Sequence, residues 1–113
     1  MKTICIFNQK GGVGKTTTNI NLCAYLAMEG YRVLTIDIDP QGNTTSGLGL
    51  DKNSLDFSMY DVLVSDTTIK ESIIKSDLVQ NLSIAPSTME LAGAEVELIN
   101  KENREKIMKD KLK

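Results

Sequence analysis

Three short segments of the chain are rich in apolar residues. They are the continuous apolar run 4–7, the segment 33–38, which closes on Asp37 and Asp39, and the segment 82–86. Runs of this length, without strict alternation of polar and apolar residues, are typical of strands buried on both faces of a parallel sheet. The pattern therefore predicts three buried strands.

Between and after these segments, apolar residues often recur at the spacing of an α-helix. Apolar residues recur at intervals of three and four from Ile20 to Ala27, which predicts a helix over 15–29 that ends at Gly30, where a positive φ is favoured. The same reasoning predicts further helical segments at 59–64, at 69–76, and over 89–113 as two helices that meet near Asn100. Residues 40–53 are rich in Gly, Thr, Ser and Asn and predict a long loop. Strands that alternate with helices indicate an α/β domain with a parallel sheet and right-handed crossovers.

Composition narrows the function classes. The 113 residues carry a net charge of −2, with 4% aromatic residues, no Trp and no His. Few aromatic side chains are available to stack on nucleic acid bases, and the net negative charge does not predict DNA binding. Cys5 and Cys23 lie far apart in apolar stretches, so we expect buried, reduced thiols. The apolar run near the N-terminus is too short for a signal peptide or a membrane span, so we expect a soluble, cytoplasmic protein without membrane contact.

The last thirteen residues are basic, with six Lys or Arg against three acidic residues and a net charge of +3. One interpretation is a nucleic-acid-binding arm. The other is a solvated helix face with cations near its C-terminus. The intervening acids and three apolar residues favour the second, namely Ile107, Met108 and Leu112.

A glycine-rich segment lies between the first expected strand and the first expected helix. It reads Lys10-Gly11-Gly12-Val13-Gly14-Lys15-Thr16-Thr17. Glycines let the main chain approach a ligand closely, and successive N–H groups together with a helix N-terminus attract phosphate oxygens. This context predicts a phosphate-binding loop in which Lys15 bridges the β- and γ-phosphates, the Thr16 hydroxyl holds Mg²⁺ and Thr17 donates to the α-phosphate. ATP and Mg²⁺ are the expected ligands.

The loop departs from the common G-x-x-x-x-G-K-[ST] pattern, because Gln9 stands where the first glycine would fall and Lys10 opens the loop. The K-G-G-x-G-K-[ST] form is the deviant Walker A signature, and residues 8–19 resemble ParA/Soj partitioning ATPases. The resemblance extends over essentially all 113 residues. It implies a P-loop NTPase fold with a mostly parallel sheet and flanking helices. In that family the additional lysine reaches the partner's phosphates across a nucleotide-sandwich dimer, and by resemblance Lys10 takes this role.

A second motif, Asp37-Ile38-Asp39-Pro40-Gln41, follows the second strand. Carboxylates at the carboxyl end of a parallel strand face the crevice where ligands bind. The resemblance gives Asp39 contact with the Mg²⁺ water shell and a part in orienting the attacking water. For Asp37 two roles remain open, supporting Asp39 or capping the strand. Residues 86–98 also resemble the family and are interpreted as a core helix with a dimer surface.

The resemblance implies an ATPase that acts in chromosome or plasmid segregation. It implies a homodimer when ATP is bound, non-specific DNA binding on the nucleoid through regions beyond residue 113, and stimulation by a ParB/Spo0J-type partner. Two alternatives stay open: a non-catalytic nucleotide-binding module, and a ParA-like ATPase that positions a protein cargo. Division-site relatives need a membrane helix, and nitrogenase-type relatives need cluster cysteines, whereas no Cys follows Cys23.

In the family the next element after these helical segments is an apolar strand ending in Asp, the Walker B strand, and the sequence up to Lys113 does not contain it. The family domain continues further, and its Walker B strand is expected beside the phosphate-loop strand. We therefore expect residues 1–113 to be the N-terminal part of a single nucleotide-binding domain.

Overall fold

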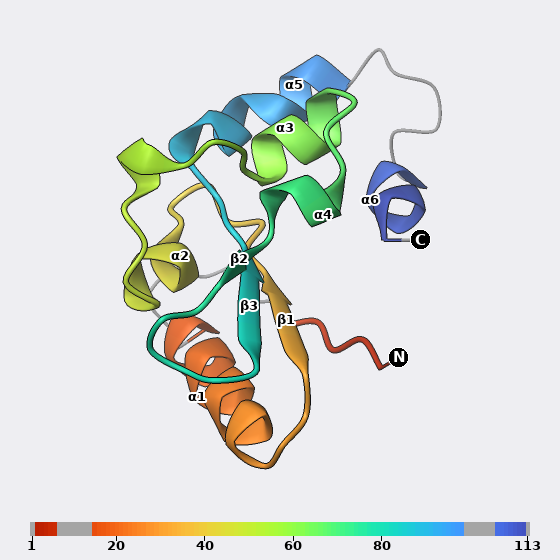
Figure 1. The fold of residues 1–113 in the computed structure, drawn as a ribbon. Coiled ribbons are helices and arrows are strands. Elements are labelled where there is room, and N and C mark those ends of the chain that lie inside the picture. The colour runs from red at the N-terminus through yellow and green to blue at the C-terminus, as the bar shows by residue number, and fades with distance from the viewer. Residues whose placement is uncertain (1, 7–14, 99–105, 113) are drawn as a thin grey trace.

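The computed structural model describes residues 2–6, 15–98 and 106–112. Three strands form its sheet: β1 (Val33–Ile36), β2 (Ile74–Lys75) and β3 (Leu82–Ala85). β3 lies in the centre, parallel to β1 with Val33 opposite Leu82, and antiparallel to β2 with Ile74 opposite Ile84 (Figure 1). Two of the three predicted strands are confirmed, and the described sheet is mixed.

The prediction of one helix over 69–76 is wrong in its second half. A capping box formed by Thr68 and Glu71 begins α4 (Ile69–Ser72), and Ile73 then adopts an extended backbone. The β-branched residues Ile73 and Ile74 suit a strand, and the open edge of β3 supplies the hydrogen-bonding partner. The short antiparallel strand β2 results.

Residues 2–6 form no strand, so the expected buried first strand is not found in the described residues. Ile4 is 63% exposed, and Cys5 is exposed, which corrects the expectation of two buried thiols. A strand needs a neighbour with which to exchange backbone hydrogen bonds. Residues 2–6 do not pair with either edge strand of the described sheet, which consists of β1, β3 and β2 in that order. Phe7 lies outside the described residues.

Helix α1 (Lys15–Met28) confirms the predicted helix. It ends where expected: Gly30 has φ 95°, its N–H donates to the carbonyl of Ala27, and the N–H of Tyr31 donates to that of Leu26. This pair of bonds is the Schellman arrangement that satisfies the last carbonyls of a helix. The turn sends the chain directly into β1.

The remaining helices are short. The expected loop over 40–53 contains α2 (Asn43–Gly47) and a 3-10 turn, η1 (Lys52–Ser54). The predicted helix at 59–64 is confirmed as α3 (Met59–Val64), and the C-terminal part contains η2 (Met89–Gly93), α5 (Ala94–Leu98) and α6 (Ile107–Lys111). The junction predicted near Asn100 lies outside the described residues.

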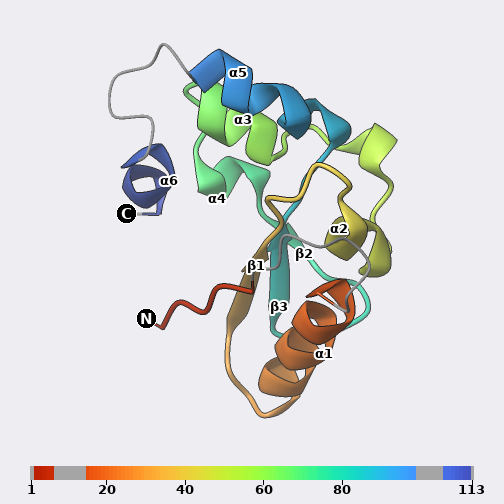
Figure 2. The same ribbon diagram turned by 180° about the vertical axis from the view of Figure 1, so that it is seen from behind.

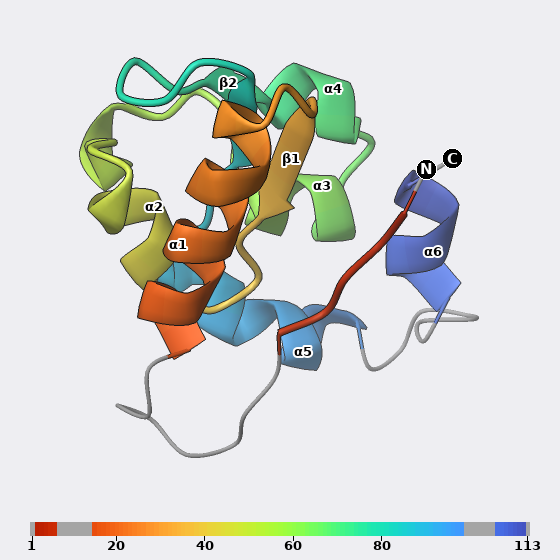
Figure 3. The same cartoon turned by 90° about the horizontal axis from the view of Figure 1, so that it is seen from below.

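Two apolar clusters lie against β3. Leu82 and Ile84 pack with Cys23 and Ala27 of α1, whereas Ala85 packs with Met59 and Val62 of α3 and with residues of α4, η2 and α5. Seen from below, α1 and the α3–α4 pair lie on opposite sides of β1 (Figure 3). The view from behind shows α3 and α5 beyond the carboxyl ends of β1 and β3 (Figure 2). The central strand is therefore buried by helices, as the apolar run at 82–86 predicts.

Helix α6 is packed against the rest of the molecule. Met108 and Leu112 contact the cluster around Met59, and Lys111 Nζ donates to the carbonyls of Ser65 and Thr67, at 3.2 Å each. These contacts favour the interpretation of the basic C-terminal segment as a helix face over that of a free nucleic-acid-binding arm. None of the helices among the described residues has the length and apolar character to cross a membrane.

Candidate nucleotide site

Polar residues follow the carboxyl ends of the two parallel strands, where ligands bind in open α/β sheets. Asp37 comes directly after β1, and its N–H continues the ladder by donating to the carbonyl of Ala85 (3.0 Å). Ser87 follows β3 two residues after its end. The N-terminal end of α1 and the whole of α2 lie at this same end of the sheet (Figure 1). The fold thus gathers one helix N-terminus and two polar loops.

Asp37 is a buried acceptor that shapes the loop after β1. It is 4% exposed, and both carboxylate oxygens are used. Oδ1 accepts from the N–H of Asp39 (3.1 Å), and Oδ2 accepts from the N–H (3.0 Å) and the hydroxyl (2.6 Å) of Thr45. Buried carboxylates need such donors, because desolvation of an unpaired charge is costly. Of the two roles left open, support of the Asp39 loop is the one that these contacts favour.

Thr45 and Ser87 join this loop to β3. Both are fully buried. The N–H of Ser87 donates to Thr45 Oγ1 (3.0 Å), and the Ser87 hydroxyl donates to the main-chain carbonyl of Asp39 (2.6 Å). Sequence reasoning assigned neither residue a role in the site. Polar residues just after strand ends were the available signal, but their pairing depends on segments 42 residues apart.

Asp39 is half-buried at the edge of the network. Its Oδ1 accepts from the N–H of Gln41 (3.0 Å), and its carbonyl accepts from the N–H of Gly42 (2.8 Å) as well as from Ser87. Gly42 has φ 62°, and a Cβ there would lie 2.9 Å from Lys52 Cδ and 3.2 Å from the Ser87 carbonyl oxygen. The loop is therefore compact, with its main chain fixed on several sides.

Asn19 links α1 to the same end of the sheet. Its Nδ2 donates to Thr35 Oγ1 in β1 (3.1 Å) and to Thr44 Oγ1 in α2 (3.3 Å), and its Oδ1 accepts from Cys23 Sγ (3.4 Å). Burial raises the pKa of the Cys23 thiol, and the hydrogen bond with Thr35 partly offsets this rise. A neutral thiol suits a packing role rather than nucleophilic chemistry. These bonds hold the first turns of α1 beside the loop of Asp39.

The predicted site residues are only partly within the described chain. Lys10, Gly11, Gly12, Val13 and Gly14 lie outside the described residues. Lys15 and Thr16 form the start of α1, but their side chains are not among those described. Thr17 is exposed in the first turn of α1, and Asp39 occupies the loop after β1. The structure brings together the start of α1 and the Asp39 loop, and the assigned roles stay predictions.

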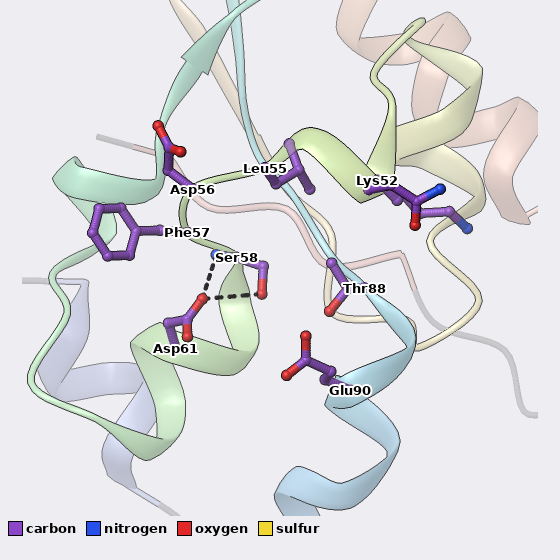
Figure 4. Close-up of a pocket in the computed structure, with 9 residues that line it drawn as sticks. Lys52, Leu55, Asp56, Phe57, Ser58, Asp61, Thr88 and Glu90 are labelled. Carbon is purple, nitrogen blue, oxygen red and sulfur yellow. Dashed lines mark hydrogen bonds between the residues drawn. The ribbon is translucent and has the colours of Figure 1, made fainter.

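A shallow pocket of about 320 Å³ opens elsewhere, between the loop before α3 and the segment after β3 (Figure 4). Asp56, Asp61 and Glu90 contribute carboxylates to its lining, with Lys52 at one end. The carboxylate of Asp61 caps the start of α3, where its Oδ2 accepts from the N–H of Ser58 (2.8 Å). Three carboxylates disfavour a phosphate, so the nucleotide is not expected here.

The donor set near Asp39 fits Mg²⁺ held with a nucleotide. The described residues contain no group of three or more His, Cys, Asp or Glu that could form an all-protein metal site. Mg²⁺ usually takes one or two protein oxygens and completes its shell with phosphate oxygens and water. The half-buried Asp39 in the loop after β1, with Thr16 at the start of α1, would provide such oxygens.

Comparison with known proteins agrees with this arrangement. A family model described as an AAA domain matches residues 1–113. The sporulation initiation inhibitor protein Soj of Bacillus subtilis is 56% identical over 104 residues, which cover 92% of this chain and 41% of Soj. The chain belongs to the ParA/Soj group of this AAA domain family. The chromosome partitioning protein ParA of Myxococcus xanthus is 48% identical over 99% of this chain and 39% of its own length. The chain thus spans about two fifths of the length of these curated relatives.

A solved structure shows the same fold. It is a cobyrinic acid a,c-diamide synthase of Mycobacterium smegmatis with a bound ATP analogue and magnesium, with a TM-score of 0.87 and 40% identity. The match covers 94% of this chain and 43% of the synthase chain. The prediction of an α/β P-loop NTPase fold is confirmed, with the qualification that the described sheet is mixed.

Proposed function

We propose that the complete gene product binds and hydrolyses ATP and acts in the segregation of DNA. The observation that carries the proposal is the Asp39 loop, which Ser87 ties to β3 and which Asn19 joins to the first turns of α1 through β1 and α2. A glycine-rich segment of the phosphate-binding type precedes that helix, and curated relatives of the chain, such as ParA of Myxococcus xanthus, are named for chromosome partitioning.

The roles proposed for individual residues follow the chemistry of phosphoryl transfer, which depends on positioning and on stabilisation of charge. The main-chain N–H groups of Gly11 to Gly14 receive the phosphates, with Lys15 on the β- and γ-phosphates and Thr17 on the α-phosphate. Thr16 and Asp39 would hold Mg²⁺ and its waters, and this ion neutralises phosphate charge when bound. Asp39 orients the attacking water.

Lys10 reaches the phosphates of a second protomer, so that hydrolysis depends on assembly of the dimer. A cation supplied by the partner stabilises the developing charge only when both protomers are in place. In the complete protein we expect this ATP-bound homodimer to bind DNA non-specifically and to be stimulated by a ParB/Spo0J-type partner. Positioning of a protein cargo is the alternative use of the same cycle.

The Asp39→Ala variant of the complete gene product tests the proposal. It should bind ATP with an affinity within about threefold of wild type, while kcat falls by at least about 100-fold, because the group that orients water is lost. Asp77→Ala is the matched control, since Asp77 is an exposed carboxylate in the connection between β2 and β3.

Three results would count against the proposal. Wild-type turnover in Asp39→Ala would remove Asp39 from the reaction. An equal loss of turnover in Asp77→Ala would show that the effect is not specific to this loop. ATP binding by wild type without any turnover would favour the non-catalytic nucleotide-binding module.

A further inference from the structure

The hydroxyls of Thr45 and Ser87 make their shortest hydrogen bonds to the Asp39 loop. Thr45 is the third residue of α2, yet its hydroxyl donates to Asp37 Oδ2 at 2.6 Å. Ser87 follows β3, yet its hydroxyl donates to the carbonyl of Asp39 at 2.6 Å. The two residues also contact each other, through the N–H of Ser87 and Thr45 Oγ1 at 3.0 Å.

These contacts form a closed circuit. Asp37 accepts from the N–H of Asp39 and from Thr45, Thr45 accepts from Ser87, and Ser87 donates back to the carbonyl of Asp39. The main chain of Asp39 is thus held at its N–H from one side and at its carbonyl from the other. The side chains of Asp37, Thr45 and Ser87 are each at most 4% exposed. If a substitution removes one of these hydrogen bonds, water therefore does not readily take the place of the missing group.

We propose that Thr45 and Ser87 are positioning residues for hydrolysis, which act by fixing the main chain of Asp39 so that its carboxylate stays aligned with the nucleotide. This inference rests on the proposed function, because it assumes that Asp39 takes part in turnover. Groups that orient a reacting or ligating side chain without touching substrate commonly change activity by about 10- to 100-fold when removed. Neither residue is proposed to touch the nucleotide.

The alternative is that the two hydroxyls only stabilise the fold. Ser72 offers a matched comparison, because it is 1% exposed and its hydroxyl donates to the carbonyl of Ile69 at 2.7 Å, in α4 rather than at the Asp39 loop. Ser87→Ala and Ser72→Ala therefore remove the same kind of buried hydrogen bond at two places. A purely structural role gives both variants the same turnover once each is assayed below its unfolding temperature.

The experiment uses the complete gene product with ATP and Mg²⁺. We expect Ser87→Ala to lower kcat about tenfold while the Kd for ATP changes by less than about threefold, and Ser72→Ala to keep wild-type kcat. Thr45→Val, which keeps the side-chain shape but removes the hydroxyl, should lower kcat by about 10- to 100-fold, and Thr45→Ser should restore most of it. Amide hydrogen exchange over residues 39–42 should be faster in Ser87→Ala than in Ser72→Ala.

A double-variant comparison with Asp39→Ala separates the inference from the proposed function. If Thr45 acts through Asp39, adding Thr45→Val to Asp39→Ala causes no further fall in kcat, because coupled residues are not additive. An Asp39→Ala variant without turnover, together with wild-type kcat in Ser87→Ala and Thr45→Val, would overturn this inference and leave the proposed function standing. Wild-type turnover in Asp39→Ala would overturn the proposed function itself.

Discussion

At the scale of single residues, the buried side chains of Asp37 and Ser87 hold the main chain of Asp39 at its N–H and at its carbonyl. The D-x-D-P-Q motif directed attention to Asp39, and the structure places it at the carboxyl end of β1 as expected. Asp37 had two possible roles, and its three hydrogen bonds to Asp39 and Thr45 favour support of the loop. Ser87 could not be recognised, because its partners become visible only when β3 is placed beside β1.

Gly42 gives a prediction at the same scale. Gly42→Ala should destabilise the protein through a positive φ and through contact of the new Cβ with Lys52 and with the carbonyl oxygen of Ser87. Gly30→Ala is the control, since Gly30 also has a positive φ but its Cβ would meet nothing within 4 Å. We expect a loss of about 1 kcal/mol for Gly30→Ala from backbone strain, and an additional 1 kcal/mol or more, roughly, for Gly42→Ala.

The measurement is the free energy of unfolding in denaturant for both variants and wild type. Equal losses for Gly42→Ala and Gly30→Ala would contradict the close packing of the Asp39 loop against Lys52 and Ser87.

At the scale of elements, the spacing of apolar residues along the chain predicted helices and where they end. The pairing of strands depends instead on which segments the fold places side by side. The spacing of apolar residues and Gly30 gave α1, and the predicted bounds of α3 match the structure. The sequence did not predict β2, because two residues are too few to show an alternating pattern of polar and apolar side chains. These residues form a strand only because they pair with the free edge of β3. Residues 4–7 have a strand-like pattern, but a pattern supplies no hydrogen-bonding neighbour.

The contact between α3 and α5 gives a prediction that depends on pH. Tyr60 Oη donates to Glu97 Oε1 at 2.6 Å, and this bond, with smaller contributions from burial and nearby acids, raises the pKa of Tyr60 to about 12. Because the folded pKa lies above the ordinary value of 10.0, the bond stabilises the protein below about pH 10 and is lost as the pH rises toward 12.

An ultraviolet titration of tyrosinate in wild type and Tyr60→Phe isolates this group. The difference between the two curves should have a midpoint near 12, and Glu97→Gln should move it toward 10, since the accepting carboxylate is lost. A midpoint that Glu97→Gln leaves in place would show that the α3–α5 contact does not exist in solution.

At the scale of the whole molecule, the start of α1 and the Asp39 loop lie at one end of the sheet, where we propose that the nucleotide binds. The α/β class followed from the alternation of strands and helices, and the P-loop fold followed from the glycine-rich segment in its context. The mixed character of the sheet could not be read from the sequence. The chain spans about two fifths of its curated relatives, so hydrolysis and partner binding are properties proposed for the complete gene product.

The most direct test of the account is the affinity of the complete gene product for ATP with Mg²⁺, measured by titration calorimetry in wild type, Lys15→Ala and Lys70→Ala. Lys70 is an exposed lysine of α4 and serves as the control. The account predicts that Lys15→Ala weakens binding by about 100-fold or more, because the charge on the β- and γ-phosphates is lost, while Lys70→Ala binds as wild type does. Equal affinity in all three proteins would contradict the assignment of residues 10–17 as a phosphate-binding loop.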